Sequence, residues 1–61
     1  MTFDVLSIRG NTVTIIADQR SRENALAIAD HGRLSVANDR CWYAIEPHGC
    51  FKSGDTWEVD L

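Results

Sequence analysis

The stretch TFDVLSIRGNTVTIIA, residues 2–17, decides the fold, because it places two β-prone runs on either side of a turn signal. Residues 2–8 and 12–17 are both rich in β-branched side chains. Between the two runs, Gly10 and Asn11 suit the central positions of a tight hairpin turn. The sequence therefore predicts an antiparallel hairpin with Gly10 and Asn11 as its turn.

The register of this hairpin sorts its side chains onto two faces. The face that we expect to form the core carries Asp4, Leu6, Ile8, Val13, Ile15 and Ala17. On the opposite face Val5 pairs with Ile16, and Phe3 lies on the same side, where an antiparallel sheet usually meets water. Phe3, Val5 and Ile16 are therefore predicted to contact a partner or to be covered by residues 33–40.

A helix is predicted next, over residues 22–31. Ser21 can cap its first turn by accepting a hydrogen bond from the amide of Asn24, and Gly32 is suited to a left-handed stop at its end. The helix is expected to lie on the predicted core face of the hairpin through its apolar stripe of Ala25, Ile28, Ala29 and in part Leu26.

The last third predicts a second hairpin. Residues 41–46 have strong β propensity, and residues 56–60 alternate between apolar and acidic side chains after the turn-forming residues 53–55. Residues 33–40 fit either a short strand or an irregular connection. The predicted fold is α+β with the order ββαββ: an antiparallel sheet of about four strands with one helix on one face.

Size and composition indicate one small folded domain over residues 1–61. Of the 61 residues, 44% are hydrophobic and 25% are charged, which is typical of globular chains and not of disordered ones. A chain this short buries only about 60% of its unfolded surface, so a bound partner or a second copy would add needed stability. The sequence has neither a run of about 20 apolar residues nor a signal peptide, and a cytoplasmic location is expected.

Residue types that carry chemistry are few. Zinc needs about four nitrogen or sulfur ligands, whereas Cys41 and Cys50 are far apart and His48 is close to only one of them. We expect reduced cysteines, no metal and no cofactor. Catalysis by Cys50 with His48 as its base would need a water-excluding cleft that is hard to build at this size, so an enzyme is not expected.

Basic residues gather around the predicted helix. They are Arg20, Arg22, Arg33 and Arg40, and they could form a small basic patch. Ordinary surface pairing with Glu23, Asp30 and Asp39 explains them better. Direct binding of nucleic acid is therefore not predicted, because it usually needs a larger basic patch with interleaved aromatic residues.

Acidic residues gather in the last third of the chain, where four carboxylates stand against Lys52 alone: Glu46, Asp55, Glu58 and Asp60. The whole chain has a net charge of −3. These residues could simply form a solvated acidic face; alternatively they attract a basic surface on a partner protein. Trp42 alternates with Tyr43 on its strand, so one of the two must lie off the core face, and we expect Trp42 to join the partner-binding surface.

In length, acidic balance and hairpin–helix–hairpin layout, ending in GDTWEVD at residues 54–60, the chain resembles the small phage-encoded proteins that include anti-CRISPR inhibitors. The resemblance implies an inhibitor that binds a CRISPR effector complex in the host cytoplasm and blocks binding of target DNA or recruitment of a nuclease. The partner would then be a protein with a basic, nucleic-acid-binding surface. The alternative is a small regulatory or structural module that acts as a homodimer, and the sequence leaves monomer and homodimer open.

Overall fold

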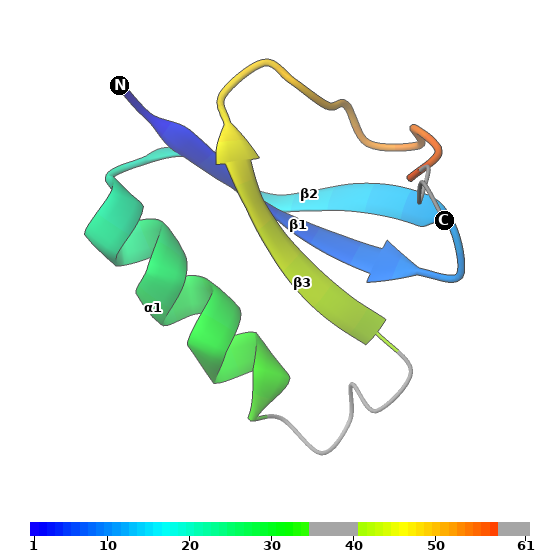
Figure 1. Ribbon diagram of the computed structural model, residues 1–61, viewed down its shortest axis with the longest axis horizontal. Helices are drawn as coiled ribbons and strands as arrows, with labels where there is room; N and C mark the ends of the chain where they lie inside the picture. The colour runs from blue at the N-terminus through cyan, green and yellow to red at the C-terminus, as the bar shows by residue number, and fades with distance from the viewer. Residues whose placement is uncertain (35–40, 58–61) are drawn as a thin grey trace.

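The computed structural model describes residues 1–34 and 41–57, and it is an α+β structure in which one helix packs on a three-stranded antiparallel sheet (Figure 1). The elements follow the order β1 (Phe3–Arg9), β2 (Thr12–Arg20), α1 (Arg22–Arg33) and β3 (Cys41–Pro47). The order in the sheet is β2-β1-β3, so the first strand is central. The described part of the chain contains no helix long and apolar enough to cross a membrane.

The first hairpin has the predicted turn. Arg9 faces Thr12 across Gly10 and Asn11, and Gly10 adopts a φ of 62°. Leu6 still faces Ile15 in the predicted register, but two irregularities follow, so that Val5 faces Ala17 and Phe3 faces Arg20. Ile16 is thus the extra residue of a β-bulge, and the predicted pairing of Val5 with Ile16 is wrong.

The helix covers the face opposite to the predicted one, and the bulge brings Ala17 onto that face. The face that carries Phe3, Val5 and Ala17 packs against Ala25, Ile28 and Ala29 of α1, together with Tyr43 and Ile45 of β3. The prediction that Phe3 and Val5 lie on the side away from the helix is therefore wrong. Val5 is fully buried, because the helix lies directly on its side of the sheet.

The opposite face is covered by the chain that follows β3. Leu6, Ile8 and Val13 are fully buried there, and their cover comes from Phe51 and Trp57. Trp57 is fixed in place by its amide, which donates to the carbonyl of Asn11 over 2.7 Å. The small protein thus has two thin cores, one on each side of a single sheet.

Within the described residues, the structure does not show the predicted second hairpin between residues 41–46 and 56–60. The third strand pairs with β1, and residues 53–57 run beside the outer edge of β2, where Thr56 makes one bridge to Thr12 (Figure 1). The amide of Val13 donates to the carbonyl of Asp55, and the amide of Gly54 donates to the carbonyl of Val13. Residues 58–60 of the predicted last strand, and most of the ambiguous stretch 33–40, lie outside the described residues.

The helix begins as predicted and ends later. Ser21 accepts a hydrogen bond from the amide of Asn24, which is the predicted cap. The helix runs past Gly32 to Arg33, so Gly32 is not a left-handed stop. The residue is small for another reason: a β-carbon at Gly32 would come within 2.7 Å of the ring of Tyr43.

We therefore expect Gly32→Ala to destabilise the protein by about 1 kcal/mol, because the clash with the buried Tyr43 ring exceeds the gain in helix propensity. Urea unfolding measures the change. Ala27 is exposed on the same helix. The control variant Ala27→Gly measures the difference in helix propensity alone and should lower the stability by about 1 kcal/mol. A Gly32→Ala protein more stable than wild type would contradict the close contact.

Candidate binding surface

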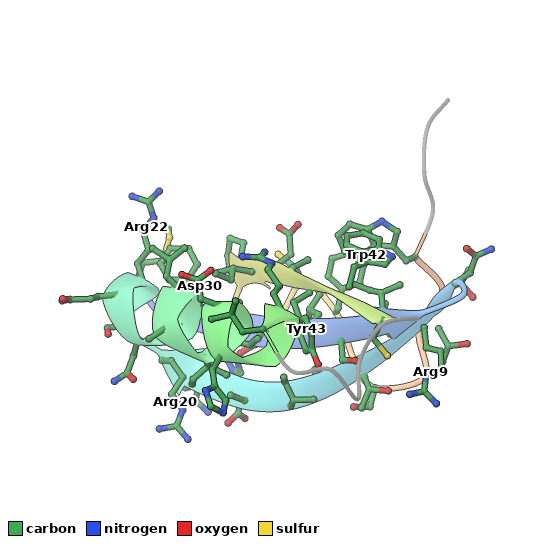
Figure 2. The ribbon with its side chains drawn as sticks, turned by 90° about the horizontal axis from the view of Figure 1, so that it is seen from below. Arg9, Arg20, Arg22, Asp30, Trp42 and Tyr43 are labelled. Atoms are coloured by element: carbon green, nitrogen blue, oxygen red, sulfur yellow. The ribbon has the colours of Figure 1, made fainter. Side chains whose placement is uncertain are left out.

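An exposed tryptophan on β3 is held by two other aromatic rings. Trp42 keeps 43% of its surface exposed. Its ring meets the ring of Trp57 edge-on, with 5.0 Å between the centroids and an angle of 88° between the planes. Trp57 in turn stacks on Phe51 at 5.1 Å. Figure 2 shows Trp42 and Tyr43 on opposite sides of the sheet, as alternation along the strand predicts, and Trp42 is the ring that lies away from the helix-covered core.

An acidic side chain shares the surface with this tryptophan. Side chains alternate along a strand, so Trp42, Ala44 and Glu46 lie on the same face of β3. Their neighbours on β1 are Ile8, Leu6 and Asp4, respectively. Glu46 is half-buried. The result is an indole and a carboxylate separated by a small alanine, which we call the Trp42–Glu46 surface.

Asp4 anchors the chain that supports this surface. Its carboxylate is almost fully buried and accepts hydrogen bonds from the ring Nδ1 of His48 at 2.8 Å, the amide of Gln19 at 3.1 Å and the amide of Gly49 at 3.3 Å. Burial would raise the pKa of Asp4, but these hydrogen bonds and the nearby His48 outweigh it and lower the pKa below its ordinary value. The ionised carboxylate thus joins β1 to the end of β2 and to the turn after β3.

This role of Asp4 was not predicted, although the sequence contained a signal for it. A carboxylate on an otherwise apolar core face needs hydrogen-bond donors if it is to be buried. The donors come from distant parts of the chain, among them Gln19, whose φ of 51° is unusual for a residue other than glycine. Only the need for partners could have been predicted, because their identity depends on the tertiary fold.

The other residues predicted to bind a partner are not gathered with Trp42. Asp55 is exposed, but its carboxylate accepts a hydrogen bond from the amide of Lys52 at 2.8 Å and so stabilises its own turn. Phe3 and Val5 belong to the core beneath the helix, and the buried Val5 has no surface to offer. Ile16 is 48% exposed at the bulge. Glu58 and Asp60 lie outside the described residues.

A shallow hollow of about 480 Å³ lies on the helix side of the sheet, away from the Trp42–Glu46 surface. Its walls are mostly hydroxyl-bearing and come from Ser7, Arg9, Thr12, Thr14, Ile16, Cys41 and Tyr43. Within it, Nε of Arg9 donates to the sulfur of Cys41 at 3.3 Å. Ile16 is the predicted partner-binding residue that borders this hollow.

The chemistry-bearing residues are dispersed. His48 is engaged by Asp4, and Cys50 is exposed in the turn that follows. Within residues 1–34 and 41–57, no group of three or more His, Cys, Asp or Glu could hold a metal ion. Arg33 pairs with Asp30 at 3.0 Å, as predicted, while Arg20 and Arg22 point to opposite sides of the ribbon in Figure 2. Arg20 and Arg22 therefore do not belong to one basic patch.

No protein-family model, curated protein or solved structure matches this chain at a significant level, so its function must be inferred from its own surface.

Proposed function

We propose that this protein acts by binding another protein through the Trp42–Glu46 surface. The observation that carries the proposal is the exposed ring of Trp42, which is held in place by Trp57 and Phe51. Tryptophan is enriched among the residues that contribute most to protein–protein affinity. A ring already fixed by its neighbours loses little side-chain freedom on binding, which favours affinity.

The surface also has a charge that favours a particular class of partner. Glu46 lies on the same face as Trp42, and the chain as a whole carries a net charge of −3. An indole ring attracts cations over its face, and a neighbouring carboxylate adds to that attraction. A partner that presents arginine or lysine beside an apolar patch would therefore fit this surface.

The more specific form of the proposal is inhibition of a CRISPR effector complex. It is supported by the acidic balance, the small α+β layout and the resemblance to phage-encoded inhibitors. In this form the Trp42–Glu46 surface occupies a basic, nucleic-acid-binding region of the effector and blocks target DNA or a nuclease.

A panel of purified CRISPR effectors of several subtypes tests this form directly. We expect the wild-type protein to bind one of them and to impede its DNA binding or cleavage, and Trp42→Ala to weaken that binding about 30-fold, which is 2 kcal/mol. Leu26→Ala is the matched control, since Leu26 is 42% exposed on the helix. If the wild-type protein binds none of the effectors, the inhibitor form is refuted and the small regulatory or structural module remains. A homodimer of that kind would be detected by its molecular mass in analytical ultracentrifugation.

A separate prediction concerns the rate of association. Glu46→Lys should slow association with the partner about tenfold at low salt, because charged groups at an interface steer the encounter more than they fix the final affinity. The effect should shrink as salt is raised past about 0.15 M. Glu23→Lys makes the same change of charge at the start of the helix and should leave the rate nearly unchanged. Surface plasmon resonance measures both; equal slowing by the two variants would show that only net charge matters.

A further inference from the structure

The two outer edges of the sheet differ in how far other parts of the chain cover them. The edge of β2 is covered by residues 53–57: the backbone of Val13 bonds to Asp55 and Gly54, and the amide of Ile15 donates to the hydroxyl of Ser53. These bonds occupy the outward-facing groups of β2 near the first hairpin. Covering an edge in this way prevents it from pairing with another chain.

The edge of β3 is less covered within the described residues. The two-residue turn makes Arg9 and Thr12 a hydrogen-bonded pair, so the backbone N–H and C=O groups of Arg9 point toward β2. These groups alternate in direction along β1, so those of Leu6 and Ile8 point toward β3. On β3 the backbone N–H and C=O groups of Tyr43 and Ile45 consequently point away from β1, toward the open edge of the sheet. The guanidinium of Arg33 donates to the carbonyl of Tyr43 at 3.1 Å, which agrees with this direction.

What remains open is a short row of backbone groups. The amide of Tyr43 and both groups of Ile45 have no hydrogen-bond partner among the residues that the structure describes. Pro47 ends the row, because it has no N–H and its carbonyl accepts from the amide of Cys50. The open row lies between Trp42 and Glu46, whose side chains project on one face of the same strand.

We propose that the partner adds an extended, basic strand to this edge of β3, antiparallel to it. This inference rests on the proposed function and names its partner's chemistry. Side chains on one face of the added strand would lie opposite Trp42, Ala44 and Glu46, so basic residues four positions apart fit the indole and the carboxylate. Backbone bonds supply affinity in such strand addition, and the alternate side chains supply specificity.

The Arg33 contact does not prevent this pairing. The side chain of Arg33 is 49% exposed and also pairs with Asp30, which is 66% exposed. When a strand arrives, its amide can replace the guanidinium on the carbonyl of Tyr43, so one hydrogen bond is exchanged for another. Until then Arg33 shields the edge, as charged side chains commonly do on edge strands.

A designed peptide tests the proposal on the intact chain. It matches the length of β3, with arginine at its second and sixth positions, valine at its fourth and threonine elsewhere. Paired antiparallel with its centre opposite Ala44, its third and fifth residues face Ile45 and Tyr43. Methylating the amides of those two residues removes the backbone bonds to β3, whereas methylating the amide of the fourth leaves them intact.

We expect the parent peptide to quench tryptophan fluorescence on binding, the doubly methylated peptide to bind at least about tenfold more weakly, and the control peptide to bind as the parent does. A peptide with glutamate in place of both arginines should not bind. Equal binding by the doubly methylated and control peptides, or no binding of the parent at about 1 mM, would overturn strand addition. Neither result tests the proposed function, which is tested separately by measuring how tightly Trp42→Ala binds the whole partner protein.

Discussion

Val5→Asp is expected to unfold the protein at neutral pH. Val5 is fully buried between the sheet and α1, where it packs with Ala25, Ala29 and Tyr43. A carboxylate at this site would lose its hydration without gaining a partner, at a cost of about 4 kcal/mol or more. A domain of this length has a total stability of roughly 3–9 kcal/mol, so the substitution removes nearly half of that stability at the upper end of the range and all of it at the lower end.

Ile16→Asp is the matched control for this prediction. Ile16 is the bulged residue and is 48% exposed, so the same change should leave the protein folded and cost less than about 1 kcal/mol. Circular dichroism and urea unfolding of both variants measure the difference. If Val5→Asp were as well tolerated as Ile16→Asp, the placement of the helix on the Val5 face would be wrong.

Asp4→Asn should have the second-largest effect, a loss of about 2 kcal/mol at neutral pH. The amide side chain removes the charge that three donors surround, and its NH₂ group must face one of them. The loss should depend on pH. Because the pKa of Asp4 is lowered in the folded state, ionised Asp4 stabilises the fold above its unfolded-state pKa, and this stabilisation disappears as the pH falls through the folded-state pKa.

Unfolding in urea between about pH 7 and about pH 2 measures this dependence. The stability difference between wild type and Asp4→Asn should be largest at neutral pH and should narrow in acid. Asp18→Asn serves as the control, since Asp18 is exposed on β2, and its effect should be small throughout. A constant difference between wild type and Asp4→Asn across this range would show that the carboxylate is not ionised in the folded protein.

The parts of the fold that depend on neighbouring residues could be predicted from the sequence. The turn at Gly10 and Asn11 and the cap at Ser21 both follow from local backbone chemistry, and both are present. The bulge at Ile16 is a different matter, because one extra residue moves the following part of β2 to the other face, so that Ala17 lies with Val5 and not with Leu6. Nothing in residues 12–20 marks that position, since Ile15 and Ile16 have the same β propensity.

The course of the last residues also could not be predicted locally. Alternation in residues 56–60 suggested a strand paired with residues 41–46, but residues 53–57 lie along β2 instead. Alternation reports that a segment is extended and says nothing about which edge it joins. Of the predicted partner-binding residues, Trp42 and Glu46 share a surface, because their spacing on one strand was enough to place them on one face.

The central claim, that Trp42 forms the binding surface, is tested most directly by quantitative affinity capture from extracts of CRISPR-carrying cells, comparing wild type with Trp42→Ala and Leu26→Ala. Both side chains are exposed to nearly the same extent, at 43% and 42%, but they lie on different elements. The surface proposed here predicts a partner protein that wild type and Leu26→Ala capture equally and that Trp42→Ala captures at least about tenfold less well. A partner retained equally by Trp42→Ala and lost from Leu26→Ala would contradict it and place the binding surface on the helix.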